Sequence, residues 1–168
     1  MVKHTLFLKW WLFMSAVTAG FTYLIAEGGL RTLWEQDFTK LSFLLLLIFI
    51  HMSAWCGYKT WRLSRFLDSD ETEKYLVEKI EKLMEAGWFA SDLCLSIGMV
   101  GTVVGFIAMM SGFGKIDVSD MTTVQDMIKS LGSGMSTALY TTLVGLVCSA
   151  LLKIQYFNLS QAIDRVRK

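Results

Sequence analysis

The sequence predicts an all-α membrane protein with four transmembrane helices, of which the last two are long. Hydrophobic residues make up 54% of the 168 residues before the 13 glycines are counted, whereas a soluble domain holds roughly 45–50% with glycine included. Charged residues are only 18%, the mean hydropathy is +0.47, and a small soluble domain could not bury so much apolar surface. Proline is absent, so nothing interrupts long helices.

The same numbers exclude two other classes of protein. A chain this rich in apolar residues is not intrinsically disordered. Its net charge of +1 provides no broad basic field, so a nucleic-acid-binding function has no electrostatic support. The expected surroundings are therefore a lipid bilayer.

Four apolar stretches are long enough to cross a bilayer. They contain 17, 18, 21 and 18 residues and are Trp10–Ala26, Leu41–Tyr58, Leu93–Phe113 and Met135–Leu152. At about 1.5 Å per residue they reach roughly 25–32 Å, which matches a hydrocarbon core of about 30 Å. The first stretch is marginal, and a signal peptide is its alternative interpretation, since Lys3, His4 and Lys9 precede the apolar run. We favour a span because the run is long for a signal core.

The distribution of basic residues gives the orientation. The N-terminus, the 59–92 connection and the C-terminal tail together hold twelve Lys and Arg residues, whereas the 27–40 and 114–134 connections hold four. Basic segments stay preferentially in the cytoplasm. Both termini are therefore expected on the cytoplasmic side, and the two short connections are expected to face outward.

Helices are also predicted outside the spans. Asp70 followed by Glu73 is typical of a capping box, and apolar residues then recur on one face, which predicts a helix over 70–86. This helix is either a contact surface for a cytoplasmic effector or, as we favour, a solvated connector. Apolar residues at 3–4 spacing continue on both sides of the fourth span and predict a single helix of about 40 residues, roughly 60 Å long. Such long helices with apolar stripes favour packing in an oligomer.

Small residues form a continuous stripe on each of the last two spans. At spacings of three and four, the third span carries Cys94, Gly98, Gly101, Gly105, Ala108 and Gly112, and the fourth carries Gly134, Ala138, Thr141, Gly145 and Cys148. Small stripes let helix backbones approach closely in lipid, where packing drives association. We expect packing within one subunit to account for part of both stripes.

Two threonines lie near the bilayer midplane. Thr102 is one residue from the midpoint of the third span, and Thr142 is close to the midpoint of the fourth. The two spans run antiparallel, so both hydroxyls are expected at similar height. Each hydroxyl either bonds to a carbonyl of its own helix or belongs to a hydrated or partner-facing lining, and the sequence leaves both open. No Asp, Glu, Lys or Arg lies within the four spans, so ion conduction would need a carboxylate from another chain.

Other candidate functional residues are few. His51, half-way along the second span, is an ionisable side chain at depth and so a functional candidate, although its bulky apolar neighbours favour a neutral histidine bonded to an adjacent helix. Cys56, Cys94 and Cys148 lack metal-ligand spacing, so neither a metal nor a disulfide is predicted. No constellation of His, Asp, Glu and Cys suggests an enzyme.

The two glycine-rich spans resemble a known family. The segments GMVGTVVGFIAMMSGF (98–113) and ALYTTLVGLVCSALLKIQYFNL (138–159) carry patterns similar to G-T-x-x-G and A-L-x-x-T-x-x-G-L of the MotA/TolQ/ExbB proton-channel family. The resemblance covers residues 93–160. It implies a subunit of an ion-driven motor in the bacterial inner membrane, in which five copies ring two copies of a one-span partner of the ExbD/MotB/TolR type. The partner's membrane Asp takes and releases H⁺ or Na⁺, and no cofactor is implied.

The resemblance also implies roles for individual residues. Two threonines match the family's pore-facing threonines, and two further hydroxyl side chains lie beside them. The ion-pathway residues are expected to be Thr102, Thr142, Thr141 and Ser149. The glycines around them are expected to serve close helix packing, and they are Gly98, Gly101, Gly105 and Gly145.

The sequence departs from the family pattern in three respects. Leu151 stands where many members have a proline late in the last span, and Thr137 stands where the TolQ/ExbB branch often has a glutamate. The cytoplasmic connection is much shorter than in flagellar stators. The machine that the chain drives is therefore left open, and the alternative is a passive four-span scaffold or pore-forming protein without a motor partner.

The expected organisation has four parts. An N-terminal helical hairpin (1–58) holds two peripheral spans, and a charged helical connection (59–92) lies in the cytoplasm. The channel core (93–160) holds the two spans that line the ring, and a basic end (161–168) is cytoplasmic.

Overall fold

The computed structural model describes residues 3–66, 73–111 and 121–166. These residues form five α-helices, which are α1 (Lys3–Ala26), α2 (Gly29–Gln36), α3 (Leu41–Phe66), α4 (Glu73–Ser111) and α5 (Met121–Val166). The described part of the chain contains no strand. The all-α prediction is confirmed.

Three of the helices are long and apolar enough to cross a membrane. Their apolar stretches are Leu41–Trp61 in α3, Met84–Ser111 in α4 and Val124–Gln161 in α5. The second, third and fourth predicted spans therefore correspond to helices of spanning length. In α1 the apolar stretch, Trp10–Ala26, is shorter.

α4 corrects one expectation from the sequence. A helix over 70–86 was predicted separately from a span that begins at Leu93, but the structure joins both in one helix of 39 residues, about 58 Å long. The chain has no proline to separate them, and Gly87 is covered by the ring of Tyr156, which lies 2.2 Å from the place of a Cβ atom there. The junction is thus packed against α5, so the backbone continues as helix. Asp70, the expected cap, lies outside the described residues.

α5 confirms the prediction that the fourth span continues at both ends. It contains 46 residues, about 69 Å of helix, which is somewhat longer than the predicted 40 residues. Because no residue between Met121 and Val166 breaks the helix, the two ends of α5 are rigidly connected through the membrane.

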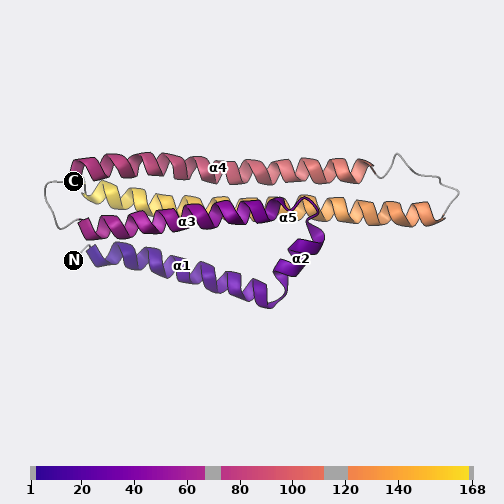
Figure 1. The fold of residues 1–168 in the computed structure, drawn as a ribbon, viewed down its shortest axis with the longest axis horizontal. Helices are drawn as coiled ribbons and strands as arrows, with labels where there is room; N and C mark the ends of the chain where they lie inside the picture. The colour runs from indigo at the N-terminus through magenta and orange to yellow at the C-terminus, as the bar shows by residue number, and fades with distance from the viewer. Residues whose placement is uncertain (1–2, 67–72, 112–120, 167–168) are drawn as a thin grey trace.

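Figure 1 shows α3, α4 and α5 side by side along the long axis of the molecule. α1 follows α3 and diverges from it toward its own C-terminal end, from which α2 returns the chain to the start of α3. The contact between α4 and α5 is the most extensive of any pair. The start of α1 and the end of α5 lie at one end of the bundle, and α4 and α5 extend beyond α3 at the other.

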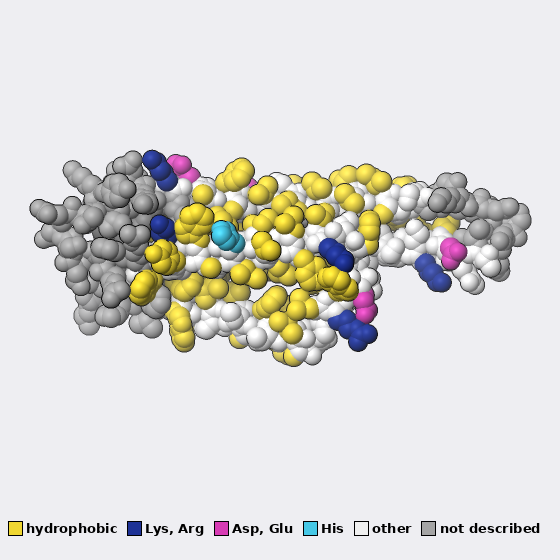
Figure 2. Space-filling model, viewed as in Figure 1, with side chains coloured by type: hydrophobic (Ala, Val, Ile, Leu, Met, Phe, Trp, Pro, Cys, Tyr) yellow, Lys and Arg dark blue, Asp and Glu magenta, His cyan; other side chains and the backbone are white. Residues whose placement is uncertain are grey.

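The surface of the bundle fits a lipid environment. Figure 2 shows hydrophobic side chains over much of the visible face, with Lys, Arg, Asp and Glu side chains on either side of them. Large hydrophobic side chains of all three long helices are exposed in the single chain. Such an apolar band is what a bilayer requires of a spanning bundle.

Glycine lets α4 and α5 approach until their backbones touch. A Cβ atom at Gly105 would lie 2.6 Å from the Gly134 carbonyl oxygen, and one at Gly145 would lie 2.8 Å from the Cys94 carbonyl oxygen. At Gly98 the nearest atom would be Gly145 Cα, at 3.3 Å. A backbone cannot move aside as a flexible side chain can, so these contacts fix the antiparallel register of the two helices.

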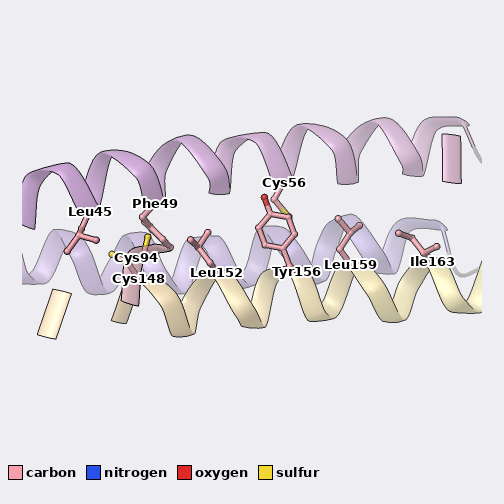
Figure 3. Close-up of a cluster of buried hydrophobic side chains, with 9 residues drawn as sticks. All are labelled: Leu45, Phe49, Cys56, Cys94, Cys148, Leu152, Tyr156, Leu159 and Ile163. Carbon is pink, nitrogen blue, oxygen red and sulfur yellow. The ribbon is translucent and has the colours of Figure 1, made fainter. Parts of the chain in front are cut away.

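A buried cluster holds α3 against α4 and α5. It comprises Leu45, Phe49, Cys56, Cys94, Cys148, Leu152, Tyr156, Leu159 and Ile163, and Figure 3 shows these side chains along the seam between the helices. The Tyr156 hydroxyl donates to the Met52 carbonyl oxygen at 3.2 Å, and the Ser53 hydroxyl donates to Gln155 Oε1 at 3.0 Å. Packing and polar contacts of this kind drive association in lipid, and together they fix where α3 lies around α5.

A polar corner joins the N-terminal helices to α5. Asp37 is fully buried, and its carboxylate accepts hydrogen bonds from backbone N–H groups within residues 39–42 at 2.9–3.1 Å. Two of these N–H groups lie in the turn just before α3, and that of Ser42 lies in its first turn and lacks a partner within the helix, so the carboxylate caps the start of α3. The Thr137 hydroxyl of α5 donates to the Gln36 carbonyl oxygen at 2.9 Å. A glutamate at position 137 would repel that carbonyl when ionised, whereas the threonine bonds to it.

We expect Gly105→Ala to destabilise the α4–α5 pair by about 1–3 kcal/mol, because the added methyl group would overlap the Gly134 carbonyl oxygen. Gly132→Ala on α5 is the matched control. No atom lies within 4 Å of a Cβ there, and alanine favours helix over glycine by about 1 kcal/mol. Thermal unfolding in detergent should show a lowered midpoint for the first variant and an unchanged or raised one for the second. Equal midpoints would contradict the backbone contact.

Candidate functional site

Thr102 and Thr142 are both half-buried in the single chain. Thr102 Oγ1 donates to the Met99 carbonyl oxygen at 2.5 Å, one turn back on α4. Thr142 Oγ1 donates to the Ala138 carbonyl oxygen at 2.9 Å and also lies 3.1 Å from the Gly98 carbonyl oxygen across the helix contact. Backbone bonds of this kind satisfy a threonine in a membrane helix, so both hydroxyls are paired here.

The two threonines lie at the same level on the same side of the α4–α5 pair. Gly101 faces Thr141, because a Cβ atom at Gly101 would lie 2.2 Å from Thr141 Oγ1. Thr102 and Thr142, each one residue further along antiparallel helices, therefore differ in height by only about 3 Å. The Gly98 carbonyl points along α4 toward Thr102, whose N–H it accepts, and Thr142 touches that carbonyl. We call this side of the pair the threonine face.

α3 covers the opposite side of the pair. One of its polar partners on α5 is Gln155, which follows Thr142 by 13 residues and so lies about 140° around the helix from it. Another is Tyr156, whose ring packs over Gly87 of α4 while its hydroxyl reaches the Met52 carbonyl oxygen. This arrangement leaves the threonine face open in the single chain. Apolar side chains three or four residues from the threonines form its rim and are 50–63% exposed: Met99, Phe106, Leu139 and Leu146.

The structure places Thr141 and Ser149 inside the chain and not on this open face. Thr141 is fully buried, and its hydroxyl donates to the Thr137 carbonyl oxygen at 2.8 Å. Ser149 is 4% exposed. The four glycines expected at close-packing positions all meet atoms of the facing helix within 3.4 Å of a built Cβ, and they are Gly98, Gly101, Gly105 and Gly145.

The remaining candidates lie apart from the threonine face. His51 is exposed on α3, and its ring meets that of Trp55, on the same helix, edge to face with 5.7 Å between centroids. Cys56, Cys94 and Cys148 are buried free thiols. Within the described ranges, no group of three or more His, Cys, Asp and Glu side chains could hold a metal ion.

Comparison with known families decides which proteins this chain is related to. The profile of the MotA/TolQ/ExbB proton channel family matches residues 62–168, which is more than half of the chain. The chain belongs to this family. Curated proteins and solved structures give no significant match. Membership suggests a proton-channel role in energy transduction, because the family consists of proton channels that work with partner proteins in a membrane complex and is not a family of enzymes.

The MotA/TolQ/ExbB region covers the whole of α4 and α5 and the last turn of α3. It begins at residue 62, well before the resemblance at 93–160, so the N-terminal half of α4 also belongs to it. α1, α2 and most of α3 lie outside it. Every residue of the threonine face therefore lies within the region that matches the family.

One contact in the MotA/TolQ/ExbB region is absent from the sequence-based predictions. Lys153 Nζ of α5 lies 3.0 Å from Asp92 Oδ1 of α4, and the two side chains are 40% and 65% exposed. The predicted third span begins at Leu93 and the predicted fourth span ends at Leu152. Asp92 and Lys153 therefore each lie one position outside a predicted span. The antiparallel register could have signalled the pair, since Asp92 and Lys153 differ in height by only about 4.5 Å once Gly101 faces Thr141.

We expect Thr142→Cys to react with a water-soluble methanethiosulfonate reagent in the assembled complex, because a hydrated threonine face would let the thiol ionise to its reactive form. Leu143→Cys is the matched control, since it is the next residue of α5 and points away from that face. The native cysteines are buried and give little background. Mass spectrometry measures both labelling rates, and equal rates would contradict a hydrated threonine face.

Proposed function

We propose that five copies of this chain form a ring in the bacterial inner membrane and conduct H⁺ or Na⁺ to drive a mechanical partner. The partner is a one-span protein of the ExbD/MotB/TolR type, present in two copies within the ring. Its membrane Asp carries the ion, and ion flow is converted to rotation or force. Family membership supports the proton-channel part of this proposal.

The observation that carries the proposal is the threonine face. Thr102 and Thr142 lie level with each other on the one side of the α4–α5 pair that α3 does not cover. In a ring, this side is proposed to face the central axis, and α1–α3 are proposed to face lipid. α1 is then a fourth, peripheral span, and both termini lie in the cytoplasm, as the basic residues predict.

The proposed organisation follows from this placement. Residues 1–58 form the peripheral hairpin, and 93–160 form the channel core. Residues 59–92 and 161–168 form its cytoplasmic parts. The continuity of α4 means that the connection and the core share one helix.

The chemistry of threonine suits a carboxyl group that changes its charge. An ionised carboxylate is costly in a low-dielectric interior. A threonine hydroxyl donates to the carboxylate when it is charged and accepts from the carboxyl group when it is protonated. The hydroxyls of Thr102 and Thr142 bond to backbone carbonyl oxygens in the single chain. These bonds are exchangeable, because each helix carbonyl already accepts the N–H of the residue four positions further on and so keeps a partner.

The carboxylate itself has to come from the partner. The chain has no Asp, Glu, Lys or Arg between Leu93 and Ser111 or between Met135 and Leu152. Ion movement through a bilayer normally uses a buried ionisable group. A one-span partner with an Asp supplies the missing group at the level of the threonines.

We expect Thr142→Ala to lower ion-driven activity by about tenfold or more while the ring stays intact, because a hydrogen bond to a charged group contributes about 1.5–3 kcal/mol. Thr142→Ser should retain activity. Thr22→Ala on α1 is the matched control, since Thr22 also bonds to a carbonyl of its own helix, at 2.9 Å, but lies off the α4–α5 pair. Ion flux into proteoliposomes checks these outcomes, and full activity of Thr142→Ala would contradict the lining role.

Native mass spectrometry of the detergent-extracted complex should show five copies of this chain together with two copies of a smaller one-span protein. Ring assembly buries the apolar rim of the threonine face and the exposed sides of α4 and α5. A stable monomer would remove the ring from the proposal. A ring that co-purifies with no partner would instead favour a passive scaffold or pore.

A further inference from the structure

The Asp92–Lys153 ion pair lies at the edge of the threonine face, away from the level of Thr102 and Thr142. Asp92 precedes Thr102 by 10 residues and so lies about 80° around α4 from it, and its contact with Lys153 joins it to the face. Lys153 follows Thr142 by 11 residues, which is three helical turns, about 16 Å along α5 and only about 20° around it. The pair thus lies toward the end of the bundle that holds the start of α1 and the end of α5 (Figure 1). In the proposed orientation this end is the cytoplasmic mouth of the pathway.

Stabilisation of the contact between α4 and α5 is a weak explanation for this ion pair. The side chains are 40% and 65% exposed, and an exposed ion pair contributes only about 0–1 kcal/mol to stability. The two helices are already held in register by backbone contacts at Gly98, Gly105 and Gly145. The pair therefore adds little to packing, whereas its place on the face brings a carboxylate to the pathway.

The Asp92 carboxylate keeps binding capacity while it is paired. The Lys153 ammonium contacts Oδ1, and a carboxylate has about four lone-pair sites in all. With most of the Asp92 side chain exposed, the remaining sites are accessible to a cation on the face. Rings of carboxylates concentrate cations at channel mouths.

We infer that Asp92 and Lys153 form a cation station at the cytoplasmic mouth of the ion pathway, an inference that rests on the proposed function. The Asp92 carboxylate receives H⁺ or Na⁺ after it leaves the level of Thr102 and Thr142. The Lys153 ammonium keeps the station close to neutral, so the ion is released and not held. In a ring of five, five such pairs surround the mouth.

Two substitutions test the station because they break the same ion pair but change the charge of the mouth in opposite directions. The complex of this chain with its co-purifying one-span partner is reconstituted in proteoliposomes. The conducted ion is first identified with wild type by offering H⁺ and Na⁺ separately. Flux driven from the side of the chain termini is then measured against the concentration of that ion on that side, so that the ion enters through the mouth that holds Asp92 and Lys153.

Asp92→Asn leaves five uncompensated ammonium groups, so the half-saturating ion concentration should rise by about threefold or more. Lys153→Met leaves five uncompensated carboxylates, so the same concentration should fall by a similar factor. If the ion pair only stabilised the helix contact, both variants would lower the unfolding midpoint and the maximum flux. The half-saturating concentration would then not shift in opposite directions in the two variants.

The matched control is the Arg31–Glu35 ion pair of α2, which has a similar distance of 2.9 Å but lies off the α4–α5 pair. Arg31→Met and Glu35→Gln should leave the half-saturating concentration unchanged. Should Asp92→Asn fail to assemble, Lys153→Met still decides, because an unchanged or raised half-saturating concentration contradicts the station.

Failure of the proposed function and failure of the station give different results. A wild-type complex that conducts neither ion contradicts the proposed function. A conducting wild type whose two variants shift in the same direction, or do not shift, contradicts the station alone.

Discussion

The close backbone contact between α4 and α5 is the constraint on which the rest of the structure depends. At Gly105 and Gly145 a Cβ atom would lie less than 3 Å from the facing backbone, and at Gly98 it would lie 3.3 Å from it. A shift of register would drive side chains into the facing backbone, so the antiparallel alignment is fixed. This alignment sets the hydroxyls of Thr102 and Thr142 at nearly the same height and brings Lys153 within reach of Asp92. In lipid such packing, and not the hydrophobic effect, drives helix association.

The second organising feature is the asymmetry of this helix pair. The buried cluster and the contacts of Gln155 and Tyr156 hold α3 on one side of the α4–α5 pair. The polar corner at Asp37 and Thr137 holds the start of α3 against α5. One side of the pair is therefore occupied within the chain, and the other is open in the single chain. The proposed ring would use this open side to line its passage.

The sequence predicts much of this fold, because helix length and lipid exposure depend on local patterns. The absence of proline and the 3–4 spacing of apolar residues predict the long α5. The capping box at Asp70 led to the wrong prediction that a separate helix precedes the third span. A local signal for the start of a helix does not show whether that helix continues into the next span. The sides on which Thr141 and Ser149 lie could not be predicted, because a small-residue stripe gives the spacing but not the facing partner. The Asp92–Lys153 pair and the Asp37 corner join residues distant in sequence and depend on the helix register.

The length of α5 has a mechanical consequence. Thr142 lies 21 residues from Met121 and 24 residues from Val166 within one unbroken helix, which is about 32 Å and 36 Å. Thr142 therefore lies near the middle of one long, unbroken helix. A tilt of about 10° around that point leaves Thr142 almost in place but swings the two tips by roughly 5–6 Å in opposite directions, by the geometry of a straight helix. In the proposed function, a small rearrangement at the level of Thr142 would thus be converted into a larger displacement at both ends of α5.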